Sequence, residues 1–379
     1  MADTGFSVNG VDIINMFELL DISTPGEDTG YFSNNHAKDL SNIFKKYTSG
    51  PYASNTGYNF KNVSGNVVDI SSQFNKKSHL TITPDVTPTM INGDYLYKLT
   101  SVNISYSVIF NDVSNVQYLV VAGGGGGGGR SMGSGGGAGG VLYGTLTSPS
   151  SKSYTMRVGS GGLGMTNSEL IGNGGDSVIS EGSSLITAVG GGGGSGQNYS
   201  FEYYQKQDPD AARQASQGGS GAGATRWESG PGQGIIGQGY NGGSYLSDAE
   251  SWGDSGGSYW STGGGGGAGG VGGGGTTTHA GNGGLGVSNN ITGSNVFYGG
   301  GGGGQLIIYG STYTKSNGGS GIGGSGGVYK GSAILRPTSG ANETGSGGGG
   351  GGGGGSWTTD DDVKGGDGGN GIIILRVSI

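Results

Sequence analysis

A long glycine block dominates this sequence and limits what the chain can fold into. Of the 379 residues, 97 are glycine, and 89 of these lie between Gly123 and Gly371. An average protein contains about 7% glycine. Ordering one backbone residue costs about 1–2 kcal/mol, and glycine loses more conformational freedom than any other residue. Because burial of side chains does not offset this cost where side chains are missing, backbone hydrogen bonds must hold any ordered form of the block together.

The block is either a disordered linker or an ordered glycine structure. Disordered linkers are monotonous in Gly and Ser, whereas short apolar segments interrupt the glycine runs here. These segments are residues 141–143, 154–158, 184–189, 295–298, 306–309 and 333–335. Extended polyglycine II helices have no internal hydrogen bonds, and glycine lets them pack closely enough to bond to one another. We therefore predict a mainly β protein with an extended glycine-rich (polyglycine II) helical bundle.

Two mainly apolar runs, residues 116–122 and 372–379, bracket the glycine block. Such runs are typical of strands that are buried on both faces. Residues 79–115 alternate between apolar and polar side chains and carry turn signals at Pro84, Pro88 and Asn92-Gly93. The pattern predicts a domain over residues 79–379, in which frame strands from 79–122 and 372–379 close the glycine block 123–371.

The first 78 residues contain a threefold internal repeat. The motifs Asp3-Thr4-Gly5-Phe6, Asp28-Thr29-Gly30-Tyr31 and Asn55-Thr56-Gly57-Tyr58 open units that are 25 and 27 residues apart. Each unit then reaches an Asp (Asp12, Asp39, Asp69) that suits a helix N-cap, followed by a short apolar pattern. We predict small repeat units with short helices. Because such units are too small to bury their own faces, we expect residues 1–78 to be an anchoring arm. Its candidate anchoring residues are Phe17, Ile43, Phe44, Ile70 and Phe74.

Composition argues against several classes of function. The chain has no cysteine and only three histidines, which leaves little material for metal or nucleophilic chemistry. Its net charge of −8 gives no basic face for nucleic acid. Apolar stretches are about five residues long, far short of the roughly 20 that a membrane helix needs, and the N-terminus lacks the pattern of a secretory signal. We expect a non-enzymatic protein with no cofactor, no membrane span and no nucleic-acid partner.

Three weak site patterns favour structural roles over chemistry. The Gly-x-Gly-x-x-Gly match at residues 159–164 is expected by chance in such a sequence, and no Gly-Lys-Ser/Thr follows it. The acidic group Asp360–Asp362, with Asp367 and Asn370, offers oxygen ligands for calcium, but Lys364 stands where an EF-hand needs a ligand. A solvated acidic loop is the preferred interpretation. The carboxylates Glu202 and Asp208 have no fixed separation that would support glycoside hydrolysis.

Aromatic side chains gather between residues 198 and 260, among polar and glycine residues. Rigid rings with polar tips suit contact with a carbohydrate or a protein surface. The candidate receptor-contact residues are Tyr199, Phe201, Tyr203, Tyr204, Trp227, Trp252, Tyr259 and Trp260. The alternative is that these rings cap the glycine structure and supply the core that it lacks.

Tyr118-Leu119-Val120-Val121-Ala122 before seven glycines looks like the opening of a glycine-rich domain family that is frequent in bacteriophage and large-virus proteins. The other matching elements are Gly139-Gly140-Val141-Leu142, Asn173-Gly174-Gly175-Asp176-Ser177, Ala188-Val189 before five glycines, Tyr298 before six glycines, and Gly371-Ile372-Ile373-Ile374-Leu375-Arg376-Val377. Similar domains, such as phage tail-fibre tip adhesins, are bundles of polyglycine II helices with receptor-contacting loops at one end. The N-terminal Thr-Gly-Tyr…Asp-Leu-Ser-Asn-Ile-Phe units likewise resemble repeats of phage and large-virus structural proteins.

This resemblance implies a virion structural protein, either capsid-associated or a fibre or tail component. It implies that the repeats bind other virion proteins, in a homo- or hetero-oligomeric assembly made in the host cytoplasm. The glycine-rich domain is then surface-exposed, and its contact is a host glycan or protein. The alternatives are an ice-binding protein or an extracellular structural glycine-rich protein. Ice binding needs a regular short repeat of aligned Thr or Ala, and an extracellular protein needs an export signal.

Overall fold

The computed structural model divides the chain into two compact units, Met1–Ser78 and His79–Ile379. In the first unit it describes six short strands. In the second it describes residues 80–111, 113–129, 132–147, 149–165, 172–196, 215–225, 230–246, 259–276, 278–308, 313–330, 333–352 and 364–378.

Each N-terminal repeat contains a two-stranded antiparallel hairpin. The pairs are β1 (Ser7–Val8) with β2 (Val11–Asp12), β3 (Phe32–Ser33) with β4 (His36–Ala37), and β5 (Asn59–Lys61) with β6 (Val67–Asp69). The first strands begin at Ser7, Phe32 and Asn59, so the hairpins follow the spacing of the sequence repeat. The prediction of short helices in these units is wrong where the structure describes them. Two of the expected helix N-caps, Asp12 and Asp69, are the last residues of strands. The five candidate anchoring residues lie outside the described residues.

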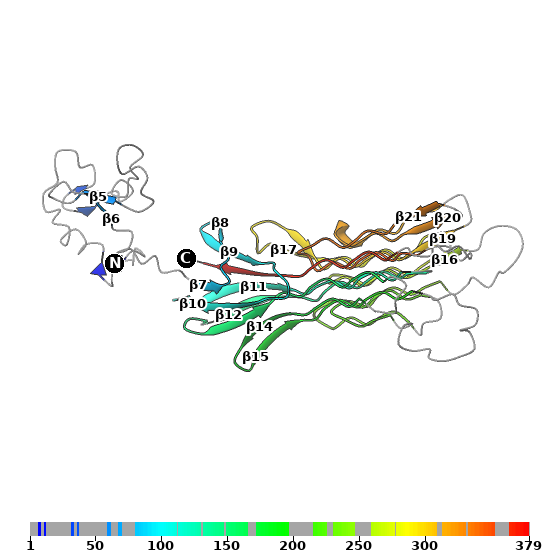
Figure 1. Cartoon of the computed structure of the whole chain (residues 1–379), viewed down its shortest axis with the longest axis horizontal. Helices are drawn as coiled ribbons and strands as arrows, with labels where there is room; N and C mark the ends of the chain where they lie inside the picture. Colours follow the sequence, from blue (N-terminus) through cyan, green and yellow to red (C-terminus); the bar gives the residue numbers. More distant parts are fainter. Residues whose placement is uncertain are drawn as a thin grey trace, which may run out of the picture. The chain divides into compact units, whose positions relative to one another are not determined.

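Two five-stranded antiparallel sheets stand together at one end of the second unit (Figure 1). The first has the order β15-β14-β13-β10-β7 and the second the order β12-β11-β22-β9-β8. The strands of the first sheet are β7 (Leu80–Thr83), β10 (Ser105–Phe110), β13 (Ser153–Arg157), β14 (Ser177–Glu181) and β15 (Ser184–Ala188). Those of the second are β8 (Thr89–Ile91), β9 (Asp94–Leu99), β11 (Asn115–Val121), β12 (Val141–Thr147) and β22 (Ile372–Val377).

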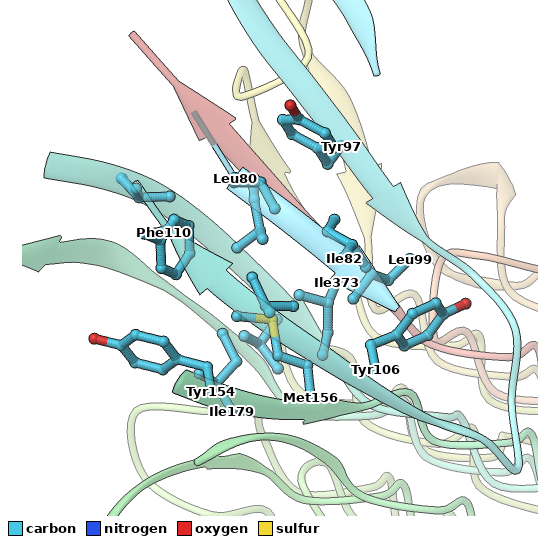
Figure 2. Packing of buried hydrophobic residues seen from close by; sticks show 14 of the residues in the cluster. Leu80, Ile82, Tyr97, Leu99, Tyr106, Phe110, Tyr154, Met156, Ile179 and Ile373 are labelled. Carbon is cyan, nitrogen blue, oxygen red and sulfur yellow. The ribbon is translucent and has the colours of Figure 1, made fainter. Parts of the chain in front are cut away.

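The facing sides of these sheets share one apolar core. Buried and exposed residues alternate along β10 and β13, because successive side chains of a strand point to opposite faces. Figure 2 shows side chains from both sheets converging, with Phe110 set edge-on to Tyr154 at a centroid distance of 5.3 Å. Leu99 and Ile373 of the second sheet are fully buried in the same cluster. The two sheets are therefore a β-sandwich.

Strands β11 and β22 lie in the middle of the second sheet and are buried on both faces. Val120 and Leu375 face the sandwich core. Leu119 and Ile374 are paired across the ladder and face a second cluster. A hairpin of β17 (Val287–Asn289) and β18 (Val296–Tyr298) contributes side chains to that cluster. The prediction that the two apolar runs are strands buried on both faces is confirmed, and the runs pair with each other.

The glycine runs form extended segments that hydrogen-bond sideways to neighbouring segments. In residues 122–128, successive amides donate to three different neighbours, and the same neighbour returns every third residue. For example, Gly124 donates to Gly369 at 3.0 Å, and Gly127 donates to Gly366 at 2.8 Å. The carbonyls of the same segment accept from three further neighbours. This central segment is thus surrounded by six others, which we call together the glycine array.

The register of these bonds shows in which direction each of the six neighbouring segments runs relative to the central one. The three segments that accept from residues 122–128 run antiparallel to it, at 134–140, 172–175 and 366–369. The three that donate to it run parallel, at 162–165, 191–194 and 348–351. Because every amide and every carbonyl direction is used, the backbone groups inside the array are satisfied without water, as buried polar groups must be.

The predicted polyglycine II helical bundle is wrong as a fold class. The only helix within the described ranges is a 3-10 turn, η2 (Gly319–Gly321), and it has a non-helical residue inside it. Apart from this turn, the regular elements of the described residues are β-strands. The part of the prediction that remains is the lateral bonding, since the glycine segments bond to one another and not within themselves.

Glycine is required in the inner segments because neighbouring backbones leave no room for a side chain. A Cβ at any of residues 123–129 would overlap a backbone carbonyl of an adjacent segment.

A four-stranded sheet lies at the end of the array opposite the sandwich (Figure 1). Its order is β16 (Tyr259–Ser261), β19 (Leu306–Ile308), β20 (Val328–Lys330) and β21 (Ala333–Leu335), with β19 and β20 parallel. We call this the distal sheet.

The array makes a clear prediction for alanine substitution. In Gly125→Ala the new methyl would meet the carbonyl of Gly192. Because both partners are backbone atoms in a bonded lattice, we expect a loss of at least about 3 kcal/mol in the free energy of unfolding. Thermal unfolding followed by circular dichroism measures it.

The matched control is Gly270→Ala, where the nearest atom is the Leu285 nitrogen at 3.5 Å from the added Cβ. This variant should be neutral or more stable by up to about 1 kcal/mol, because alanine restricts the unfolded chain. Equal losses in the two variants would contradict the close-packed array.

Candidate interaction surface

The distal sheet brings together the residues that flank three connections of the chain. The strand registers place Tyr259, Ile308, Lys330 and Ala333 side by side in one row. Ile308 and Lys330 end their strands, whereas Tyr259 and Ala333 begin theirs. The connection before Tyr259 and the connections after Ile308 and Lys330 therefore all lie at the same end of the four strands.

The flanks of further connections lie at this same end. A Cβ at Gly129 would touch the Met165 carbonyl, and one at Gly196 would touch the Gly129 carbonyl. The segment ends at 129, 165 and 196 are thus adjacent. The end at Gly352 is joined to the distal sheet through Gln305, which lies next to Leu306 in the chain. We call this end of the array, with the distal sheet, the distal end.

Most candidate receptor-contact residues belong to connections that leave from the distal end. Gly196 lies there, Gly263 donates to the Ala224 carbonyl at 2.9 Å, and Leu246 donates to Ser261 of β16 at 3.3 Å. Tyr199, Phe201, Tyr203 and Tyr204 follow Gly196, Trp227 follows Thr225, and Trp252 follows Leu246. These six lie outside the described residues. Tyr259 and Trp260 are in β16, and the Trp260 side chain is half-buried opposite Ile307. For Trp260 the geometry favours the capping role over free contact.

A buried glutamine clamps the distal end. The Gln305 side chain is fully buried, and its Oε1 accepts from the Gly133 amide at 2.9 Å. Its Nε2 donates to the Gly352 carbonyl at 2.7 Å. The Thr262 hydroxyl, also fully buried, donates to the Gly133 carbonyl at 2.9 Å. Four segments that are far apart in the sequence are joined here by a carboxamide, which resembles a peptide group, and by a hydroxyl.

The Gln305 clamp predicts a pH-dependent variant. In Gln305→Glu the carboxylate still accepts from Gly133, but it has no proton to donate to Gly352 and is charged in a buried site. We expect a loss of about 3–5 kcal/mol at neutral pH. Part of this loss should recover in mild acid, where the protonated carboxyl donates to the Gly352 carbonyl. Urea unfolding at two pH values measures the difference.

The control is Gln233→Glu, because Gln233 is exposed. It should change stability by less than about 0.5 kcal/mol at either pH. A Gln305→Glu protein that is as stable as this control at neutral pH would contradict the clamp.

Side chains replace backbone carbonyls as hydrogen-bond acceptors at the outside of the array. Where no further glycine segment is present, the side-chain oxygen of an Asn, Asp, Ser or Thr accepts a backbone amide of the adjacent segment. Asp367 accepts from Gly164 at 2.7 Å, and Asn370 accepts from Gly161 at 2.8 Å. The other acceptors of this kind are Asn173, Asp176, Asn241, Asn282, Ser320, Thr338, Ser339 and Asn342. We call this set the acceptor belt.

The acceptor belt was missed by sequence reasoning, although a signal for it exists. Asp367 and Asn370 are three residues apart inside a glycine run, as are Asn173 and Asp176, and this spacing matches the threefold repeat of amide directions. Uninterrupted glycine, as at residues 123–129, marks an inner segment. Single polar residues spaced by three mark an outer one.

The structure gives Asp367 and Asn370 this structural role. Asp367 also forms an ion pair with Lys364 at 2.6 Å. Among the described residues no three His, Cys, Asp or Glu side chains form a group that could hold a metal ion; Asp360–Asp362 lie outside them. The Gly-x-Gly-x-x-Gly match at 159–164 is a segment of the array, in which Gly162 donates to Gly124 at 2.8 Å.

Asp367 provides a test of the belt. Asp367→Asn keeps an acceptor oxygen for Gly164 and loses only an exposed ion pair, so we expect a change below about 0.5 kcal/mol. Asp367→Ala leaves the buried Gly164 amide without its acceptor and should cost about 1 kcal/mol or more. Hydrogen exchange at Gly164 should accelerate in the Ala variant alone; equal exchange in both variants would contradict the belt.

Other polar groups of the second unit also act structurally. Burial raises the pKa of the Tyr97, Tyr154 and Tyr298 hydroxyls above the ordinary tyrosine value, so these groups stay neutral. A shallow hollow of about 210 Å³ lies beside Tyr154, between β12 and β13–β15. Its one carboxylate, Glu181, is paired with Lys152 at 3.6 Å. The hollow does not bring two carboxylates together.

The fold and surface define a glycine-rich β domain, in which a sandwich and a distal sheet hold a laterally bonded glycine array. The model of the glycine-rich domain family matches residues 100–378, and the chain belongs to this family. The match begins after the three N-terminal repeats. A search of curated proteins gave no match. In the part of the chain that the structure describes, no helix has the length and apolarity to cross a membrane.

Proposed function

We propose that this chain is a non-enzymatic structural protein of a virion, in which the glycine-rich unit is displayed on the particle and contacts the host. One observation supports this best: the residues that flank the aromatic-rich connections meet at the distal end. A support that carries its aromatic-rich connections at one end suits a surface that meets a partner. The resemblance to phage and large-virus proteins supplies the setting.

The array accounts for a support of this kind without a large apolar core. Each segment is held by backbone bonds on several sides, and each bond contributes about 0.5–1.5 kcal/mol. The sandwich closes one end and the Gln305 clamp with the distal sheet closes the other. Connections that leave the distal end are thereby held at fixed starting points, which lowers the entropy lost when they bind.

In this proposal residues 1–78 attach the protein to other virion proteins. Three similar hairpin units offer three similar contacts, and linked contacts bind more tightly than one alone. Deletion of residues 1–78 should leave a folded glycine-rich unit that no longer enters particles. Particle purification followed by immunoblotting measures incorporation; unchanged incorporation would contradict an anchoring role of this unit.

The host-contact surface is tested with a triple variant, Tyr204→Ala, Trp227→Ala and Trp252→Ala. We expect at least about a tenfold loss of binding to host cells, because aromatic residues carry much of the binding energy of interfaces. The thermal midpoint should stay unchanged. The matched control is Phe297→Ala, an aromatic residue of β18 that is 46% exposed. Binding that falls equally in both, or that falls only with unfolding, would contradict the proposed surface.

A further inference from the structure

The sequence contains Asn-Gly pairs, and one of them stands apart in the structure. Asparagine before glycine is prone to lose its side-chain amide, because the next amide nitrogen attacks the side-chain carbonyl and glycine offers no steric hindrance. The described pairs are Asn92-Gly93, Asn173-Gly174, Asn241-Gly242, Asn282-Gly283, Asn317-Gly318 and Asn370-Gly371. All but Asn92-Gly93 lie in the glycine array or on its belt.

In the array pairs, the peptide that joins Asn to Gly is held by a backbone hydrogen bond. Gly174 donates to Gly191 at 2.9 Å, and Gly371 donates to Gly159 at 2.9 Å. Gly242 donates to Gly232 at 3.0 Å. Gly283 donates to the Asn317 carbonyl at 2.8 Å, so this bond holds the nitrogen of the Asn282-Gly283 peptide and the carbonyl of the Asn317-Gly318 peptide. Attack by the nitrogens of Gly174, Gly242, Gly283 and Gly371 requires the array to open first.

The side chains of most array pairs are held as well. Asn173, Asn241, Asn282 and Asn370 accept backbone amides through their side-chain oxygens at 2.8–2.9 Å. Exposure does not separate the pairs, since Asn173, Asn241 and Asn282 are as exposed to solvent as Asn92. The difference lies in the hydrogen bonds.

Asn92 and Gly93 form the two-residue turn between β8 and β9. Their φ angles are 52° and 90°, in the left-handed region that an Asn-Gly hairpin turn uses. Both residues are exposed, and nothing lies within 4 Å of a Cβ built on Gly93. Within the described part of the chain, no hydrogen bond reaches the peptide between them or the Asn92 side chain. The turn is free to rotate into a reactive geometry while the fold stays intact.

We propose that Asn92 is a site of spontaneous deamidation in the folded protein, with water as the co-reactant. The Gly93 nitrogen gives up its proton to solvent base and attacks Cγ of Asn92. The Cγ–Nδ2 bond breaks, ammonia leaves, and a five-membered succinimide forms. Water then opens the ring at either carbonyl, which leaves aspartate or isoaspartate at position 92.

The neighbouring contacts give this modification a structural consequence. Isoaspartate adds one carbon to the main chain of a two-residue turn, whose length sets the pairing of β8 with β9. Ile91 packs against the apolar cluster on the outer face of the second sheet. Asp94 holds Arg376 of β22 at 2.6 Å. Conversion at Asn92 therefore loosens β8 at the edge of the sheet.

The experiment incubates the full chain at mildly alkaline pH, in native buffer and in denaturant, and follows each Asn-Gly pair by peptide mapping with isoaspartate quantification. In native buffer Asn92 should convert at least about tenfold faster than Asn173, Asn241, Asn282 and Asn370, because those pairs need local opening of the array. In denaturant all should convert at similar rates. A native rate at Asn92 no greater than at the array pairs, or the same lead for Asn92 in denaturant, would overturn the proposal.

Two variants support the assignment. Asn92→Gly removes the reacting carbonyl in a turn that glycine accommodates, so the peptide that contains residue 92 should stay unchanged in mass. Asn92→Asp carries the new charge without the longer main chain. If isoaspartate loosens the turn, aged protein should unfold at a lower temperature than Asn92→Asp; continued conversion of the Asn92→Gly peptide would place the reaction elsewhere.

Discussion

The lateral hydrogen bond between side-chain-free backbone segments is the interaction on which the second unit depends. Each inner amide has a partner in a neighbouring segment, and the direction of bonding changes at every residue and repeats every third. This geometry requires the segments to lie so close that a single methyl would overlap a carbonyl. The glycine content of the inner segments is therefore a steric requirement and not a mark of flexibility.

The array is too weakly held by itself to offset the entropy of so many ordered glycines, and the apolar elements at its ends reduce that cost. The sandwich fixes the ends of several segments. The central segment starts directly after Val121 of β11, and the last segment ends directly before Ile372 of β22. The Gln305 clamp fixes the other end with two fully buried polar side chains. Segments held at both ends lose less entropy when they bond along their length.

The framework was predictable from the sequence, whereas the interior and most of the candidate surface were not. Strands buried on both faces were predictable at residues 116–122 and 372–379, because mainly apolar runs of that length are typical of such strands. The lateral bonding between glycine segments was expected, but the helical bundle was not found, because the regular elements of the described residues are β-strands. Composition revealed the aromatic residues, and only the strand registers of the distal sheet and the contacts between glycine segments placed their connections at one end. Gln305 gave no local signal, since its role depends on Gly133 and Gly352, which are remote in sequence.

Edges are the general difficulty for a laterally bonded structure, because unpaired amides invite further chains to bind. The acceptor belt resolves this with short polar side chains that take the place of a missing segment. Asn and Asp occupy equivalent positions, which indicates that an acceptor oxygen matters more than charge. The same bonds hold the Asn side chains of most Asn-Gly pairs in the array. The acceptor belt thus limits both the lateral addition of further chains and the deamidation of Asn-Gly pairs. The turn at Asn92 lies outside the belt.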